Sequence, residues 1–130
     1  MTAGRLQALT AALGAGSVAF GLPPLLAPRF CGRVFGFASI NQPDVATAFR
    51  SIGARDVAVG YGLWRAAQRG EDVAPWLLAR LICDTTDTVG CAIAIGEGIR
   101  HPRFLTLTGF AALAAAGAAL LFQQARTTTR

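Results

Sequence analysis

Two long uncharged segments, one near each end of the chain, set the strongest limit on its fold. Residues 6–28 and 104–125 contain no Asp, Glu, Lys or Arg. Each reaches the roughly 20 residues with which an α-helix crosses the hydrocarbon core of a bilayer. Neither shows the polar stripe of a soluble amphipathic helix. We therefore expect both to span a membrane. The alternative is a soluble Ala-rich bundle, because Ala is only weakly hydrophobic.

Two further helices are expected between these segments. Pro75 suits the first turn of a helix, and Gly96 suits a helix end. The polar connectors, residues 69–75 and 96–103, are short, so consecutive helices should be antiparallel neighbours. The chain is then one all-α domain, residues 1–130, forming an integral membrane four-helix bundle. Its helices are predicted over residues 6–26, 46–67, 76–96 and 104–124.

The predicted location is the inner (plasma) membrane, crossed several times, with both termini on one side. The longest link, residues 29–45, contains the basic and aromatic stretch RFCGRVFGF, which suits the headgroup region. A small excess of arginines on the terminal side favours termini in the cytoplasm. That side would carry Arg5, Arg65, Arg69, Arg126 and Arg130, and the other side Arg29, Arg33, Arg100 and Arg103.

Charged residues lie in the middle of the two inner helices, where a bilayer tolerates them least. Arg55 and Asp56 are adjacent within GARDVAVGYG, and Arg80, Asp84 and Asp87 lie within ARLICDTTDTVG. The spacing of the second group puts its members on one helical face, and glycines flank Asp56 on its own face. A charge left at the bilayer centre costs about 3 kcal/mol or more. We therefore expect these five side chains to turn inward and pair across the two helices.

Ion pairing alone does not balance this cluster, because two central arginines face three aspartates. Three solutions remain open. Arg50 or Arg65 also reaches the cluster, one carboxyl is held protonated, or a cation or a substrate completes the set. Desolvation and a second nearby carboxylate both favour a neutral acid, so the protonated form is physically reasonable.

Several classes of function are disfavoured. The formal net charge is +5, but the arginines are scattered and form no basic patch, so we expect no nucleic-acid partner. The three cysteines have neither zinc nor disulfide spacing, and His101 is a single histidine in a loop. Asp84 and Asp87 could share a Mg²⁺ ion, but no third acid is assured and Arg80 competes. We expect neither a metal nor a cofactor.

Three stretches carry a family likeness: GLPPLLAPRFCGRVFGF, GARDVAVG and RLICDTTDTVG, within residues 21–90. In these stretches the chain resembles the family catalogued as domain of unknown function 4267. These are small membrane proteins related to the wider DoxX-like four-helix group. The final helix is similar only as an apolar span. The resemblance implies a four-helix membrane fold and no particular activity. It places the family's charged motif on Arg55, Asp56, Arg80, Asp84 and Asp87.

Two classes of function follow from the charged cluster. In the first, the protein binds a small lipophilic molecule and performs acid–base isomerisation or cyclisation on it. Asp84 and Asp87, with Asp56, would be the catalytic carboxylates, while Arg55 and Arg80 would bind substrate or set the charge. In the second, the protein is a non-enzymatic membrane subunit whose cluster is a structural ion-pair network. A proton or ion relay is a further alternative.

The expected partners follow from the same reasoning. They are membrane lipids, the lipophilic molecule, and either a partner membrane protein or a second copy of the chain. The sequence does not decide whether the protein is an enzyme.

Overall fold

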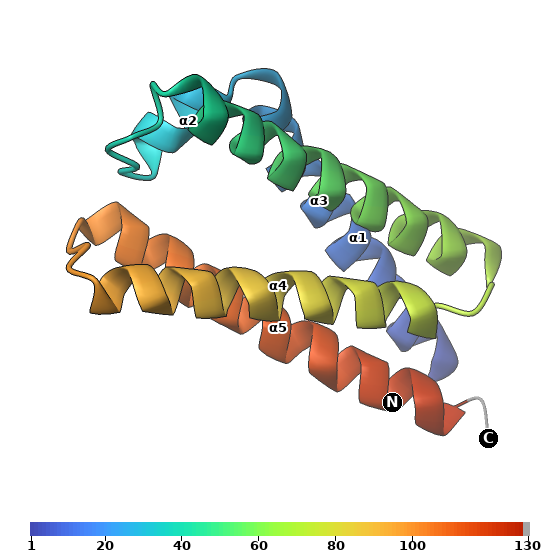
Figure 1. Ribbon diagram of the computed structural model, residues 1–130. Helices are drawn as coiled ribbons and strands as arrows, with labels where there is room; N and C mark the ends of the chain where they lie inside the picture. Colours follow the sequence, from blue (N-terminus) through green and yellow to red (C-terminus); the bar gives the residue numbers. More distant parts are fainter. Residues whose placement is uncertain (129–130) are drawn as a thin grey trace.

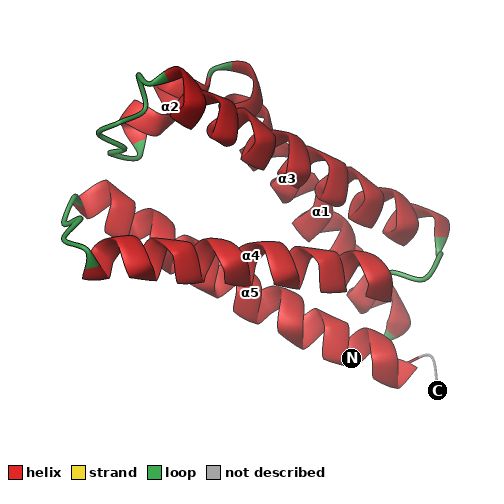
Figure 2. Ribbon diagram, viewed as in Figure 1, coloured by secondary structure: helices red, strands yellow, loops and turns green. Residues whose placement is uncertain are grey.

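The computed structural model describes residues 1–128 and is all-α over that range, with no strand (Figures 1 and 2). Its helices are α1 (Ala3–Leu26), α2 (Pro28–Val34), α3 (Pro43–Arg69), α4 (Ala74–Gly96) and α5 (Pro102–Thr128). The four long helices lie where the sequence predicts them. The short α2 was not predicted and occupies part of the link between the first two long helices. Arg130 is one of the arginines from which the orientation in the membrane was predicted. It lies outside the described residues.

Proline and glycine fix where these helices begin and end. A proline lies in the first turn of α2, α3, α4 and α5, where its missing N–H is not needed by the helix. The α1 helix instead begins with a cap, in which the Thr2 hydroxyl accepts a hydrogen bond from the backbone N–H of Arg5 at 3.4 Å. At the other end of α3, Gly70 adopts a left-handed conformation with φ of 67°, which glycine tolerates without strain.

The long helices are arranged as two pairs (Figure 1). α1 packs along α3, and α4 packs along α5, whereas the two pairs contact each other much less. They meet at the end that holds both termini, where a core joins α1, α3, α4 and α5. That core consists of Leu6, Leu63, Ala66, Ala67, Val73, Leu77 and Ala125. Away from this end the two pairs diverge (Figure 1).

The prediction that α3 and α4 are close neighbours is therefore wrong over most of their length. The two helices are antiparallel, but the glycine face of α3 packs on α1 instead (Figure 1). A Cβ atom added to Gly53 would lie 2.6 Å from the carbonyl oxygen of Gly21, and one added to Gly60 would lie 2.7 Å from that of Gly14. These four glycines let the α1 and α3 backbones touch.

Other glycines of α1 and α5 make no such close contact. A Cβ atom added to Gly16, Gly109 or Gly117 would meet no atom within 4 Å. The glycines of the α1–α3 seam therefore allow a close backbone approach, whereas Gly109 and Gly117 of α5 make no such contact.

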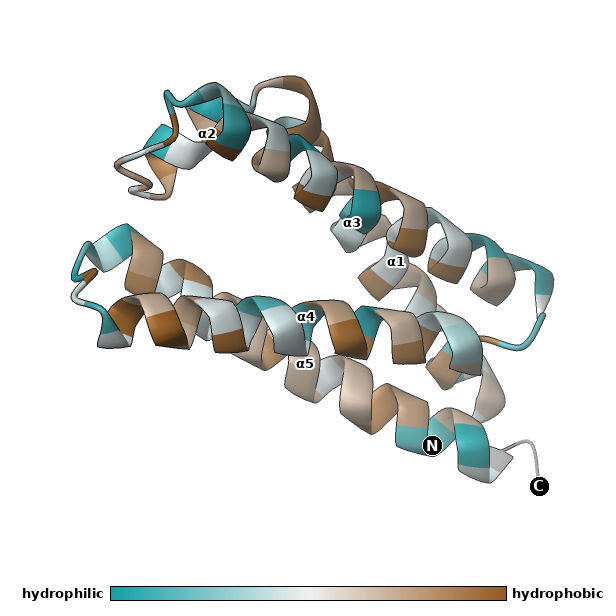
Figure 3. Ribbon diagram, viewed as in Figure 1, coloured by the Kyte–Doolittle hydropathy of each residue, from teal (hydrophilic) through white to brown (hydrophobic). Residues whose placement is uncertain are grey.

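Two of the helices are long and apolar enough to cross a membrane, α1 and residues 102–127 of α5. Only 22% of the most apolar part of α1 and 11% of that of α5 is buried, whereas the central helix of a soluble protein would be mostly covered. α3 and α4 do not meet the same test, because charged residues interrupt them midway (Figure 3). Membrane character is thus supported for two of the four predicted spans.

Candidate functional site

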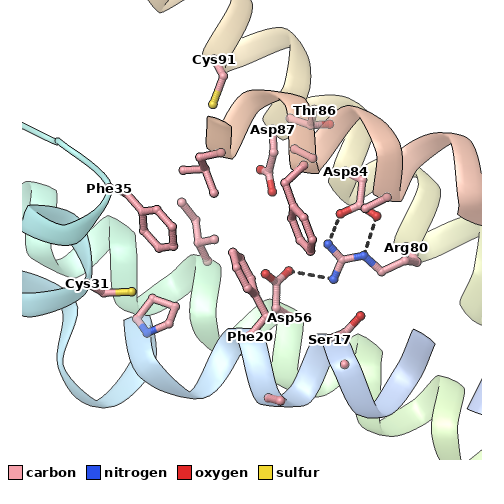
Figure 4. Close-up of a pocket in the computed structure, with 18 of the residues that line it drawn as sticks. Ser17, Phe20, Cys31, Phe35, Asp56, Arg80, Asp84, Thr86, Asp87 and Cys91 are labelled. Carbon is pink, nitrogen blue, oxygen red and sulfur yellow. Dashed lines mark hydrogen bonds and ion pairs between the residues drawn. The ribbon is translucent and has the colours of Figure 1, made fainter. Parts of the chain in front are cut away.

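A pocket of about 730 Å³ lies between the two helix pairs (Figure 4). All four long helices and the segment around α2 contribute to its wall. Most of the lining is apolar and includes five phenylalanine rings. One side carries charged groups (Figure 4). The rings belong to Phe20, Phe35, Phe37, Phe49 and Phe110. The divergence of the pairs therefore creates a cavity of the size that holds a small organic molecule.

The innermost part of the charged wall is an Arg80–Asp84 pair on one face of α4. Nε of Arg80 donates a hydrogen bond to Oδ2 of Asp84 at 2.7 Å, and Nη2 donates to Oδ1 of the same carboxylate. The third nitrogen, Nη1, donates to Oδ1 of Asp56 on α3 at 3.1 Å (Figure 4). The side chains of all three residues are at most 7% exposed. Arg80 thus links two buried carboxylates across the gap between the helix pairs.

A second arginine, Arg55, completes the network from the outer side. Its Nη1 and Nη2 donate to the two carboxylate oxygens of Asp87 at 3.1 and 2.6 Å, in the two-point geometry that favours arginine over lysine. Nε and Nη2 of Arg55 also donate to Oδ1 of Asp56 at 3.2 and 2.9 Å. The side chains of Arg55 and Asp87 are 28% and 29% exposed. This pair is therefore the solvent- or lipid-accessible part of the network.

The structure brings all five charged residues singled out from the sequence into one network. The two arginines proposed as additional partners, Arg50 and Arg65, are exposed and form no ion pair with it among the described residues. When all five groups are ionised, two arginines and three aspartates leave one excess negative charge.

The hydrogen bonds indicate which carboxylate carries the excess negative charge. Asp84 and Asp87 each use both carboxylate oxygens, whereas three donor bonds reach Oδ1 of Asp56 and, among the described residues, none reaches Oδ2. Asp56 lines the pocket and is 3% exposed. The free acceptor of the cluster is therefore on Asp56, not on the Asp84–Asp87 pair that the sequence favoured.

The aromatic residues of the site were not predicted as pocket residues. The stretch RFCGRVFGF was expected at the headgroups, but Cys31, Phe35 and Phe37 line the pocket. Phe37 also packs edge-on against Phe104 of α5, with ring centroids 5.1 Å apart, which links the two helix pairs at the α2 end. The sequence signal was available in the density of phenylalanine, but nothing in it shows which wall the rings face.

The remaining polar groups near the pocket are either satisfied or weakly reactive. The Ser17 hydroxyl donates to the Leu13 carbonyl oxygen of its own helix at 2.9 Å. Cys31 is buried, and burial raises the pKa of its thiol, so the nucleophilic thiolate is disfavoured. Within residues 1–128, no group of three His, Cys, Asp or Glu side chains has the arrangement to hold a metal ion. The chemistry of the site therefore resides in the arginine–aspartate network.

The Arg55–Asp87 pair is expected to couple the two helix pairs energetically. In a double-mutant cycle of Arg55→Gln and Asp87→Asn, we expect a coupling energy of about 1–2 kcal/mol. The matched control is Arg69 with Glu71, whose atoms lie 3.9 Å apart with side chains 58% and 55% exposed. Its coupling should be close to zero. Titration with sodium dodecyl sulfate measures both; equal couplings for the two pairs would contradict the assignment.

Comparison with known proteins identifies a family for this chain. The family described as "Domain of unknown function (DUF4267)" matches residues 14–121. The match is wider than the predicted 21–90 and includes most of α5. It does not bear on the wider DoxX-like group, which stays a prediction. No curated protein and no solved structure shows significant similarity to the chain.

Proposed function

The chain belongs to the DUF4267 family, whose description assigns no activity, and we propose that it binds a small lipophilic molecule inside a membrane. In this proposal α1, α3, α4 and α5 all cross the inner membrane, and the pocket between the helix pairs is the binding site. The observation that carries the proposal is a largely apolar pocket with a buried charged network in its wall. Binding sites for small molecules have this composition, with a few polar groups fixing orientation.

The charges in the middle of α3 and α4 are compatible with membrane spans because they turn inward. Arg50 and Arg65 are exposed, but they lie nearer the ends of α3, from which their long side chains can reach the membrane surface. The α4 charges all belong to the network, while Ile82, Val89 and Ile93 on the same helix are more than half exposed. α3 has 27 residues and α4 has 23, which gives lengths of roughly 40 and 35 Å. Both exceed the roughly 30 Å thickness of the hydrocarbon core. Paired charges that face a bundle interior mark functional sites in membrane proteins.

The pocket is open to a ligand that arrives from the lipid. Several of its lining residues are exposed on the surface of the long helices, namely Ala12, Gly16, Ala19, Ile52 and Gly90. If these helices span the bilayer, this opening faces the acyl chains. A molecule dissolved in the membrane would then enter sideways between the helix pairs, without crossing water.

Two photoreactive probes that resemble the proposed class of ligand test the binding function. They share one alkyl-phenyl-diazirine body and end in a hydroxyl group or in a trimethylammonium group. The protein is placed in lipid nanodiscs, and labelling is measured against increasing concentrations of the same molecule without the diazirine. Saturable labelling by either probe is the expected result. Labelling that never saturates with either probe reflects simple partition into lipid and would overturn the proposal.

Filling the pocket should abolish this binding. Gly90 lines the pocket, and a Cβ atom added there would meet no atom within 4 Å, so Gly90→Phe places a ring in the cavity without a backbone clash. We expect the concentration for half-saturation to rise about tenfold or more. Gly109→Phe is the matched control, because Gly109 also faces open space but does not line the pocket. Equal effects of the two variants would show that binding takes place elsewhere.

Acid–base catalysis on the bound molecule is the extension that the network favours. Oδ2 of Asp56 is the carboxylate oxygen left free, so a proton would be exchanged there and not at Asp84 or Asp87. In this proposal Asp84, Asp87 and both arginines position Asp56 and set its charge. A purely structural network is the competing proposal, supported by the ion pairs that join α3 to α4.

A further inference from the structure

We propose that the ligand of this pocket is a lipophilic monocation, a molecule with one positively charged head group and an apolar body. The head group lies against Oδ2 of Asp56, and the body lies among the phenylalanine rings. The inference rests on the proposed binding function and names the class of molecule that the site takes. Three observations carry it: the charge balance, the free carboxylate oxygen and the composition of the wall.

The charge balance is the first observation. The network holds Arg55 and Arg80 against Asp56, Asp84 and Asp87, and no other described residue forms an ion pair with it. Its formal charge is therefore −1 when all five groups are ionised. Isolated charge in a medium of low dielectric constant is strongly disfavoured, and either protonation of a carboxylate or a nearby opposite charge removes it. A ligand with a single positive charge would bring the site to zero, whereas an anionic ligand would raise the imbalance.

The free oxygen of Asp56 is the second observation, because it is where the positive head group of the ligand would lie. All three donor bonds to this carboxylate reach Oδ1, from Nε and Nη2 of Arg55 and from Nη1 of Arg80. These bonds fix the carboxylate so that Oδ2 remains available in the wall of the pocket, where Figure 4 shows Asp56 pointing into the cavity. Asp84 and Asp87 offer no equivalent oxygen. The head group is thus held by a carboxylate that is already oriented before the ligand arrives.

The composition of the wall favours a cation with an apolar body. Phe20 and Phe35 point into the same cavity as Asp56 (Figure 4), and the Phe110 ring stacks on Phe20 with centroids 5.3 Å apart. The face of an aromatic ring attracts a cation, more strongly where water is excluded. The volume of about 730 Å³ also exceeds the space that a simple metal ion or a small ammonium ion would need. A drug-sized organic cation fits both the aromatic wall and the volume of the pocket.

The hydroxyl and trimethylammonium probes also test this inference, because they differ in charge and share the same body. Both are titrated on the unmodified protein in zwitterionic nanodiscs, with concentrations referred to the lipid phase. We expect the trimethylammonium probe to half-saturate at a concentration about tenfold or more below that of the hydroxyl probe. Saturable labelling with equal half-saturation, or tighter binding of the hydroxyl probe, would overturn the inference and leave the binding function standing. Absence of saturable labelling with both probes would overturn the binding function itself.

Substitution of Asp56 tests whether its carboxylate is responsible for the tighter binding of the ammonium probe. Asp56→Asn removes the charge and preserves the shape, so it should reduce the advantage of the ammonium probe about tenfold or more. The matched control on the same helix is Asp44→Asn, because Asp44 is exposed and does not line the pocket. An unchanged advantage in a folded Asp56→Asn variant would overturn the assignment of the head group to Asp56. If this variant does not fold, the comparison of the two probes on the unmodified protein still decides the charge of the ligand.

Discussion

Replacing Arg80 with methionine is expected to lower the free energy of unfolding by about 3–5 kcal/mol. Arg80 donates hydrogen bonds to both oxygens of Asp84 and to Asp56, and its side chain is 7% exposed. Methionine retains much of the volume but leaves the Asp84 carboxylate buried without a counter-charge. Removing one member of a buried ion pair is costly for this reason. Reversible unfolding with sodium dodecyl sulfate in mixed micelles measures the change.

Two further variants separate charge from packing in this experiment. Arg65→Met is the control, because Arg65 is exposed on α3, and its effect should stay within about 0.5 kcal/mol. The double variant Arg80→Met with Asp84→Leu removes both charges and should recover most of the lost stability, because apolar pairs replace buried ion pairs well. A loss that persists in the double variant would show that Arg80 contributes by packing or through its bond to Asp56, and not by pairing with Asp84.

Replacing Gly53 with alanine is expected to produce the second large effect, a loss of about 3 kcal/mol in the free energy of unfolding. The added Cβ atom would lie 2.6 Å from the Gly21 carbonyl oxygen and 2.5 Å from the backbone nitrogen of Leu25. Both neighbours are backbone atoms of α1, so no side-chain rotation relieves the clash and α1 must move away. Because α1 carries part of the pocket wall, saturable probe binding should weaken in the same variant.

The control for this substitution should change stability in the opposite direction. An alanine at Gly109 meets no atom within 4 Å, and alanine favours a helix over glycine by about 1 kcal/mol or less. Gly109→Ala is therefore expected to leave stability unchanged or slightly raised. If Gly53→Ala were as stable as Gly109→Ala, α1 and α3 would not be in backbone contact, and the arrangement of the helix pairs would be wrong.

The four long helices could be predicted because their signals are local. The two long uncharged segments identify α1 and α5. Pro75 and Gly96 mark the start and end of α4 within a residue or two. α2 was missed because seven residues between a proline and a turn give no periodic pattern. The pairing of the helices could not be predicted either. The glycines of GARDVAVG indicate that another backbone can approach α3, but they do not indicate which helix does so.

The charged members of the site could be predicted, but neither its aromatic wall nor its geometry could. Helical spacing alone placed Arg80, Asp84 and Asp87 on one face, and the cost of burying charge required partners on α3. Which carboxylate keeps a free oxygen depends on the reach of two arginine side chains, which spacing does not define. The pocket depends on the divergence of the helix pairs, a tertiary property. The role predicted for Asp84 and Asp87 is for this reason transferred to Asp56 in the proposed mechanism.

The most direct test of a ligand pocket between the helix pairs is the position of the probe after photolysis. Labelled residues are identified by peptide mass spectrometry, with and without an excess of the unreactive analogue. The proposal predicts competition-sensitive labels on pocket residues such as Thr86, Cys91 and Phe110. Labels confined to outward-facing residues that do not line the pocket, such as Ile93 and Leu113, and insensitive to competition would contradict it.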